Sequence, residues 1–256
     1  MAILNVTPDS FSDGGQCLTP DAAAERAKQL ADEGADIIDV GGESTRPGSE
    51  PISEDEELRR VVPALIAIRE AGVTLPISID TRRAAVASAC IELGATIVND
   101  VSALESDPDM PRVVRDAGVF GVLMHGYYPP SEPVTTASVI RYLRERIDFV
   151  VSCGISRDKL IADPGFGFNK DTGENLEILA HLDQFAELGV PVLSALSRKR
   201  FIGAATGVNE PSARVAGSVA GALWSATHGA AIVRVHDVAA TRQALDLLQA
   251  TQARRA

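Results

Sequence analysis

Cationic side chains gather where the last two apolar segments of the chain end. Lys199 follows the first of these segments, and Arg234 and His236 lie at the end of the second. A guanidinium presents a bidentate fork to phosphate, and an ammonium adds a mobile point charge. Arg234 and His236 are two residues apart, so in a strand their side chains face the same way. The spacing indicates binding of an anion such as phosphate, and an ion pair with Asp163 or Asp237 is the structural alternative.

A second group of polar side chains, Asp80, Asn99 and Asp163, follows three other apolar segments. Carboxylates accept hydrogen bonds from more than one donor, and the amide of Asn99 can donate as well as accept. Such a set suits a flat heterocycle that presents several N–H groups. An internal polar network between strands would use the same residue types, so these residues alone leave both interpretations open.

Short apolar segments alternate with longer amphipathic ones along the chain. The apolar segments are rich in Ile, Val and Leu, which is typical of parallel strands buried on both faces. We predict strands at Ile3–Val6, Ala35–Val40, Pro76–Ile79, Thr96–Asn99, Phe120–Met124, Leu160–Ala162, Pro191–Ala195 and Ala231–Val235. We predict helices near 20–33, 53–71, 82–93, 109–117, 135–153, 174–188, 211–228 and 238–250. Thr19 and Pro20 suit the N-cap and first position of the first helix.

The regular alternation of strand and helix predicts right-handed βαβ units with a parallel sheet. Eight such units in about 250 residues predict a (β/α)8 barrel, or TIM barrel, as a single α/β domain over residues 1–256. A doubly wound open sheet is the alternative. The carboxyl ends of barrel strands form the active-site mouth, where the polar residues above would converge.

Composition and charge narrow the class of protein. The 256 residues carry 24 Lys and Arg against 35 Asp and Glu, a formal net charge of −11. This charge argues against nucleic acid as a partner, because phosphate contacts need clustered cations. We find neither an apolar stretch of the ~18 residues that suggest a membrane span nor the pattern of a signal peptide. The 3 cysteines lack metal-binding spacing and fit a reducing compartment, so we expect a cytoplasmic protein without a membrane partner.

Two turn-rich segments follow the first two predicted strands. Residues 5–15 (NVTPDSFSDGG) are mostly polar and turn-rich and contain one isolated aromatic, Phe11. Residues 41–48 (GGESTRPG) combine glycine, proline and hydroxyl side chains. Long loops over a barrel mouth are usually functional. We therefore expect both segments to cover a bound substrate.

Motifs along nearly the whole chain resemble those of dihydropteroate synthase. They are NVTPDSFSDGG at Asn5–Gly15, DVGGESTRPG at Asp39–Gly48, IDT at Ile79–Thr81, NDVS at Asn99–Ser102, DPGFGF at Asp163–Phe168, SRKRF at Ser197–Phe201 and RVHD at Arg234–Asp237. The resemblance implies a transferase of folate biosynthesis that is a sulfonamide target. It would join 6-hydroxymethyl-7,8-dihydropterin pyrophosphate to p-aminobenzoate, giving 7,8-dihydropteroate and pyrophosphate, with Mg²⁺ as cofactor.

The resemblance also implies roles for individual residues. The pterin would be held by Asp80, Asn99, Asp163 and Lys199, with Met124 and Phe168 lining its slot. Pyrophosphate would be held by Asn5, Arg234 and His236, with Asn5 near the metal ion. The p-aminobenzoate pocket would be framed by Phe11, Thr45, Pro47, Phe168 and Lys199. The catalytic set would comprise Lys199, Arg234 and His236 with the loop residues Asp13, Thr45 and Arg46.

Two features bear on specificity and assembly. Arg200 stands where many relatives carry a serine that helps to hold the aminobenzoate carboxylate, and an arginine there can bind a carboxylate through its backbone or guanidinium. We therefore expect Arg200 to bind substrate. The family is commonly dimeric through its later helices, and small residues within 211–228 permit close helix packing, either between two copies or within one chain. This resemblance implies a homodimer.

Three other functions fit parts of this pattern. A methyltetrahydrofolate:corrinoid methyltransferase would share the acidic pterin contacts, but it needs neither the Arg234–His236 pair nor the first loop. A pterin-binding paralogue without turnover would show losses at Lys199, Arg234 or the first loop, and none is lost. A phosphosugar enzyme with a barrel fold would not explain Phe11 or the loop sequence STRPG.

Overall fold

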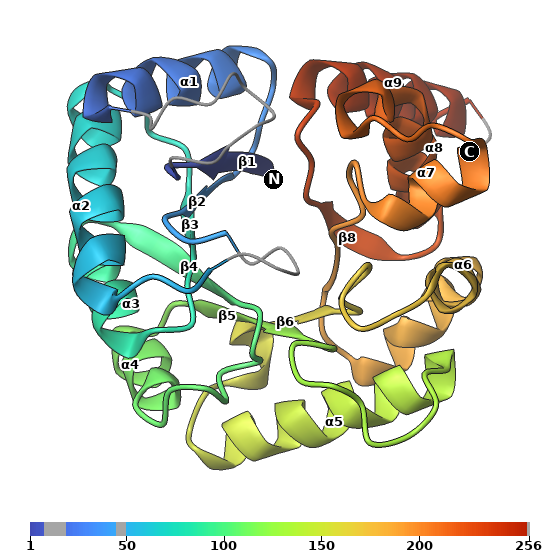
Figure 1. Cartoon of the computed structure of the whole chain (residues 1–256), viewed down its shortest axis with the longest axis horizontal. Helices are drawn as coiled ribbons and strands as arrows, with labels where there is room; N and C mark the ends of the chain where they lie inside the picture. Colours follow the sequence, from blue (N-terminus) through green and yellow to red (C-terminus); the bar gives the residue numbers. More distant parts are fainter. Residues whose placement is uncertain (8–18, 45–49, 255–256) are drawn as a thin grey trace.

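Parallel strands form the centre of the molecule and helices surround them (Figure 1). The structure is a computed structural model that describes residues 1–7, 19–44 and 50–254. Within these residues, eight parallel strands form one sheet in sequence order. They are β1 Ala2–Asn5, β2 Ile38–Gly41, β3 Ile77–Asp80, β4 Ala95–Asp100, β5 Phe120–Met124, β6 Leu160–Asp163, β7 Val192–Ser194 and β8 Ala230–Val233. The predicted barrel is confirmed, and the predicted strands differ only at their ends.

The sheet closes on itself between β8 and β1. Ala2 and Val235 form a parallel bridge, and the N–H of Ile3 donates to the Val235 carbonyl over 3.0 Å. The N–H of Val235 donates in turn to the Met1 carbonyl over 2.9 Å. A doubly wound sheet would have two open edges, so this closure excludes the alternative topology.

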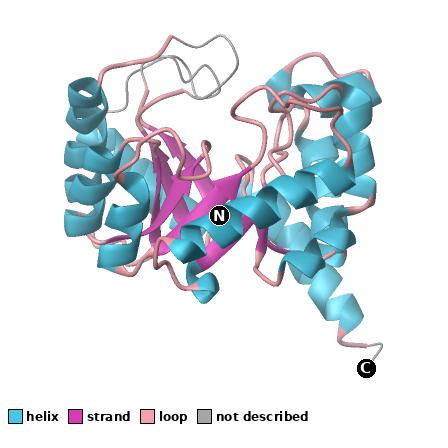
Figure 2. Ribbon diagram, turned by 90° about the horizontal axis from the view of Figure 1, so that it is seen from below, coloured by secondary structure: helices cyan, strands magenta, loops and turns pink. Residues whose placement is uncertain are grey.

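Helices connect consecutive strands and lie outside the sheet (Figure 2). The α-helices of the described residues are α1 Pro20–Asp32, α2 Glu54–Glu70, α3 Ala84–Glu92, α4 Met110–Ala117, α5 Thr136–Ser152, α6 Thr172–Ala180, α7 Arg200–Thr206, α8 Val215–Thr227 and α9 Val238–Gln252. Helix α1 begins as predicted, because the Thr19 hydroxyl accepts the N–H of Ala22 and Pro20 occupies the first position. No helix in the described part of the chain is long and apolar enough to cross a membrane.

An apolar layer lies inside the barrel beneath the polar ends of the strands. Its buried members are Met1, Ile97, Val122, Ile161, Leu193 and Ala195. Side chains two residues apart on a strand share a face, so Asn99, Met124 and Asp163 continue this inner face toward the carboxyl ends. A larger cluster between strands and helices forms the outer core. The candidate functional side chains therefore lie directly above a layer of packed apolar side chains.

Two helices differ from the prediction. The expected helix near 174–188 is split into α6 and a 3₁₀ segment, Leu182–Leu188. Helix α7 was not predicted at all, because the motif SRKRF looks like a polar loop. Phe201 and Ile202 are nevertheless buried, and Gly207 ends the helix with a left-handed φ of 75°. Burial of two apolar residues stabilises a helix too short to show a periodic pattern.

Candidate active site

A salt-bridge cluster occupies the mouth of the barrel. Arg234, which follows β8, donates from Nε to Oδ2 of Asp39 over 2.6 Å and from Nη2 to Oδ2 of Asp80 over 2.9 Å. Asn99 donates from Nδ2 to the same Asp39 oxygen over 3.1 Å. Arg234 therefore does form ion pairs, which was the structural alternative to anion binding, but its partners are not the ones expected. Its partners are Asp39 and Asp80, whereas Asp237 pairs with Arg198 over 2.5 Å.

The cluster leaves hydrogen-bond acceptors unused. Asp39, Asp80, Asn99 and Asp163 are each at most 7% exposed. Oδ1 of Asp39 and Oδ1 of Asp80 are buried and have no hydrogen-bond partner among the described residues. Leaving a buried carboxylate oxygen unpaired is costly. Such oxygens are therefore suited to accept hydrogen bonds from the N–H groups of a bound heterocycle.

Burial shifts the acid–base behaviour of these carboxyl groups. Loss of hydration raises the pKa of Asp80 to about 7; Arg234 opposes this shift, and Asp39 adds to it. Burial likewise raises the pKa of Asp163, against the attraction of Lys199. It raises the pKa of Asp100 to about 6, although hydrogen bonds from Ser102 and Leu104 oppose the change. Burial in the mouth thus favours the protonated form of these carboxyl groups.

The Asp80→Asn variant should change how stability depends on pH. Between about pH 4 and pH 7 the folded protein holds protons on Asp80 that the unfolded chain has released, so the free energy of unfolding falls as pH rises. Removing the carboxyl group should make this decrease in the free energy of unfolding smaller by about 2–4 kcal/mol. Urea denaturation of both proteins at several pH values from 4 to 8 measures the slope, and an unchanged slope in the variant would contradict the expectation.

Lys199 and Phe168 form the other side of the mouth. The Lys199 ammonium lies 4.3 Å from the centroid of the Phe168 ring and donates to the Phe166 carbonyl. Loss of hydration lowers the pKa of Lys199 to about 8; Asp163 opposes the shift and Arg234 adds to it. Gly167 permits this approach, because a Cβ there would lie 2.7 Å from Cδ of Lys199. A charge and a ring of this kind suit a planar ligand with an acceptor group.

Lys170 holds the neighbouring loops together, a role that no sequence motif indicated. Its ammonium donates to the carbonyls of Gly165 over 2.9 Å, Phe168 over 3.1 Å and His125 over 3.3 Å. These carbonyls belong to the loops after β5 and β6. Lys170 therefore fixes the backbone that carries Phe168 and follows Asp163.

The Lys170→Met variant should be less stable by about 1–3 kcal/mol, because it leaves carbonyl groups without their donor. If the mouth binds a planar heterocycle as its substrate, the loosened loop should also raise the KM for that substrate more than it lowers kcat. Denaturation and steady-state kinetics measure the two effects. Lys28→Met is the matched control, since Lys28 pairs only with Glu25 on the surface of α1 within the described contacts. Equal stability of the two variants would contradict this role.

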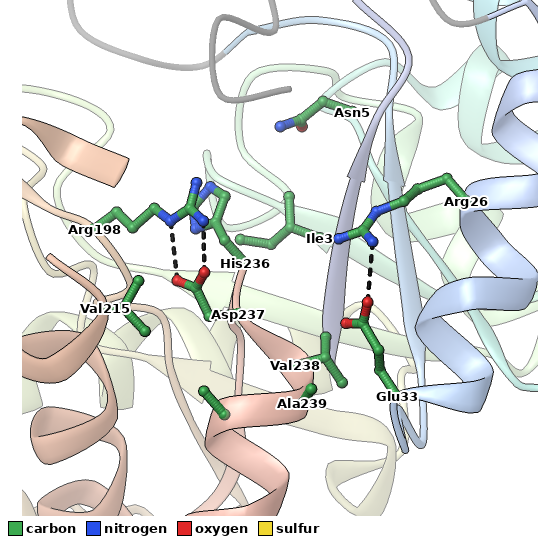
Figure 3. A pocket seen from close by; sticks show the side chains of 11 residues that line it. Ile3, Asn5, Arg26, Glu33, Arg198, Val215, His236, Asp237, Val238 and Ala239 are labelled. Carbon is green, nitrogen blue, oxygen red and sulfur yellow. Dashed lines mark hydrogen bonds and ion pairs between the residues drawn. The ribbon is translucent and has the colours of Figure 1, made fainter. Parts of the chain in front are cut away.

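Asn5 and His236 line a separate cavity beside the mouth (Figure 3). His236 is held by Ser197, whose hydroxyl oxygen lies 3.1 Å from Nδ1 and accepts the His236 N–H over 3.2 Å. Arg234 does not line this cavity. Arg234 contacts the acidic cluster, and His236 lines the neighbouring cavity together with Asn5.

Glu43, Arg82 and Arg83 form an ionic cluster, here called the clasp. It links the start of the second turn-rich segment, residues 41–48, to Ile52, which follows that segment. Glu43 accepts hydrogen bonds from Arg82 over 3.1 Å, from Arg83 over 2.6 Å and from the Ile52 N–H over 3.3 Å. Arg83 also donates to the Ile52 carbonyl and to Glu57. The clasp thus brings residues 43 and 52 together. The sequence motif included Glu43 but gave no indication of its partners.

The structure describes some of the remaining predicted residues, and the others lie outside its described part. Met124 is buried at the end of β5, and Arg200 is exposed as the first residue of α7. Five predicted residues lie outside the described part of the chain: Phe11, Asp13, Thr45, Arg46 and Pro47. Asp39 was missed as a site residue, although its position in a strand-end motif was a usable signal.

Comparison with known proteins gives the family. The family model described as pterin binding enzyme matches residues 1–236. A dihydropteroate synthase of Bacillus subtilis is 45% identical over 239 residues, which cover 93% of this chain and 83% of the relative. This chain belongs to the dihydropteroate synthase family. The resemblance drawn from the motifs is confirmed, as is the implied enzyme class, a transferase.

Solved structures of the family agree with the fold. Dihydropteroate synthase of Xanthomonas albilineans with 4-aminobenzoic acid is 50% identical and has a TM-score of 0.93, over 99% of this chain and 92% of that one. Its complex with 7,8-dihydropteroate has a TM-score of 0.90 at 48% identity, over 99% and 93% of the two chains. A probable bifunctional folylpolyglutamate synthase/dihydropteroate synthase of Haloferax volcanii is 44% identical over 93% of this chain. The chain spans only 29% of that protein.

Proposed function

We propose that this chain joins 6-hydroxymethyl-7,8-dihydropterin pyrophosphate to p-aminobenzoate, giving 7,8-dihydropteroate and pyrophosphate in folate biosynthesis. The observation that carries the proposal is a pair of buried oxygens, one on Asp39 and one on Asp80, which lack a hydrogen-bond partner among the described residues and would accept the N–H groups of a pterin. Family membership and the ligands of the Xanthomonas structures, 4-aminobenzoic acid and 7,8-dihydropteroate, support it.

The pterin would bind with its N–H edge toward the acidic cluster. Asp80, Asn99 and Asp163 supply acceptors and an amide on one inner face of the barrel. Lys199 donates to a ring acceptor, and Met124 and Phe168 line the slot. Burial excludes water from these contacts, so each hydrogen bond discriminates strongly between heterocycles.

The reaction breaks the bond between the pterin methylene carbon and a pyrophosphate oxygen. The electron pair leaves with the oxygen, and the positive charge that develops on the methylene carbon is delocalised into the pterin ring. Carboxylates such as Asp163 and Asp80 stabilise that cation, which favours a dissociative, SN1-like route. Asn5, Arg234 and His236 would stabilise the charge on the departing pyrophosphate.

Mg²⁺ fits this site as a companion of pyrophosphate. No group of three or more acidic, histidine or cysteine side chains among the described residues forms a metal cage. Magnesium characteristically uses only a few protein oxygens together with substrate phosphates and water, and the Asn5 amide oxygen would be the protein group near the ion. When bound, the ion would neutralise charge on the phosphate oxygens.

The attacking group is the aniline nitrogen of p-aminobenzoate. It is neutral at pH 7 and forms the new C–N bond before it releases a proton, so no strong general base is needed. We propose that Phe11, Thr45, Pro47, Phe168 and Lys199 frame this substrate and that Arg200 binds its carboxylate. Asp13, Thr45 and Arg46 belong to the loops that would cover the reacting groups.

The proposal extends to the setting of the enzyme. We infer that residues 1–256 act as one pterin-binding domain, that two copies associate as a homodimer, and that the enzyme works in the cytoplasm. The partners would be the two small substrates, with neither nucleic acid nor membrane involved. On α8, Ala216 and Ala220 are exposed and would permit close packing with a second copy, whereas Gly217 and Gly221 pack against Ile202 and Leu196 of the same chain.

Product identification tests the function. Purified chain, Mg²⁺ and both substrates should yield 7,8-dihydropteroate, detected by mass spectrometry, and the Asp163→Asn variant should yield far less. The variant keeps the size of the side chain but removes the charge that stabilises the pterin cation. Tight pterin binding without dihydropteroate would instead assign the chain to the non-catalytic pterin binders.

A further inference from the structure

A cavity of about 270 Å³ lies beside the barrel mouth, between α1 and the start of α9 (Figure 3). Asn5 and His236, both predicted to hold pyrophosphate, form one part of its lining. Arg26 enters from α1, and Arg198 faces it from the loop after β7. The volume approaches that of the smallest ligand pockets, about 300 Å³. The cavity therefore has room for a small ligand next to the reaction site.

The two guanidiniums in this cavity each pair with a carboxylate of the described residues. Arg198 donates twice to Asp237, from Nε over 2.9 Å and from Nη2 over 2.5 Å. Arg26 makes a weaker pair, because among the described contacts it donates only once, from Nη1 to Glu33 Oε1 over 3.2 Å. A guanidinium has five N–H donors. Arg26 thus keeps donors available to the cavity, toward which Figure 3 shows it pointing.

The first turn of α9 adds to the positive potential. Ala239 and Ala240 line the cavity, and the Asp237 side chain makes no capping hydrogen bond to the helix among the described contacts. Its carboxylate is turned toward Arg198 instead. Helix N-termini attract anions through their free N–H groups and their dipole. The start of α9 supports the two guanidiniums in favouring an anion.

We propose that this cavity receives pyrophosphate once it has left the pterin and that Arg26 is an additional pyrophosphate-binding residue. The inference rests on the proposed function, which supplies the pyrophosphate. The cavity shares Asn5 and His236 with the predicted leaving-group site, so the product need move only a short way. Glu33 is the internal competitor for Arg26, and a phosphate oxygen would replace its contact with a stronger, bidentate one.

Two substitutions with opposite effects test the assignment. Isothermal titration calorimetry with magnesium pyrophosphate should show a Kd about tenfold higher for Arg26→Gln, the loss of one charged donor group. Glu33→Gln should lower the Kd, because it removes both a competitor for Arg26 and a like charge. Lys28→Gln on the same helix is the control. It removes a cation that does not line the cavity and should leave the Kd unchanged.

Product inhibition gives an independent readout. The inhibition constant for pyrophosphate should rise in Arg26→Gln and fall in Glu33→Gln. Wild-type affinity in both variants would overturn the inference and leave a solvent-filled gap between two ion pairs. That result would not affect the proposed function, which dihydropteroate formation tests separately. Pyrophosphate binding with the expected variant effects, but without dihydropteroate formation, would support the pyrophosphate cavity and overturn the proposed reaction.

Discussion

Lys199→Ala is expected to lower kcat/KM for dihydropteroate formation by about two to three orders of magnitude. The substitution removes a cation that lies 4.3 Å from the Phe168 ring centroid and faces the charge of Asp163. It also removes the donor that we propose for the pterin. Steady-state kinetics with both substrates measures the effect, and thermal unfolding checks that the variant is folded.

Lys159→Ala is the matched control for this experiment. Lys159 also lies over an aromatic ring, 4.5 Å from the centroid of Phe120, but Phe120 starts β5 and so lies at the opposite end of the barrel. Its loss should leave turnover unchanged. Because the pKa of Lys199 is about 8, the wild-type rate should fall above pH 8 as the ammonium loses its proton. Lys199→Arg should extend activity to higher pH if charge alone matters, and equal rates for wild type and Lys199→Ala would contradict the role.

Arg234→Met is expected to lower the free energy of unfolding by about 3–5 kcal/mol at pH 8. Arg234 is the cation that pairs with both Asp39 and Asp80, whose side chains are almost fully buried. Without it, two carboxylates face each other in a site from which water is excluded. Guanidinium chloride denaturation measures the loss, and activity should disappear with it.

The origin of this loss can be separated from simple loss of packing. At pH 5 Asp80 can take up a proton, so the deficit of Arg234→Met should be smaller than at pH 8. The triple variant Arg234→Met, Asp39→Asn, Asp80→Asn should recover stability without recovering activity. A deficit that is the same at both pH values, and is not relieved in the triple variant, would point to packing instead of charge.

The sequence predicted the barrel because its fold depends on a repeated local pattern. Buried parallel strands are apolar on both faces, and Phe120–Met124 or Ala230–Val233 show this without long-range information. Helix α7 was missed because its 7 residues are stabilised by burial of Phe201 and Ile202, which only the folded chain provides. Tertiary packing here outweighs local propensity.

Residue types at the strand ends predicted the chemistry of the site, but not its contacts. Arg234 and Asp39 are 195 positions apart, so their ion pair depends on closure of the barrel. Lys170 binds backbone carbonyls, which carry no sequence signal. Arg26 lies on an amphipathic helix, where an arginine usually faces solvent. Such partners follow from three-dimensional proximity and could not be predicted from spacing.

The most direct test of the proposed condensation is pyrophosphate release by the purified chain with Mg²⁺ and the dihydropterin pyrophosphate, with and without p-aminobenzoate. We expect sustained release only when both substrates are present, in equal amount to the dihydropteroate formed. Release that proceeds equally well without p-aminobenzoate would show hydrolysis, and no release despite pterin binding would show a binding protein. Either result would contradict the proposed condensation.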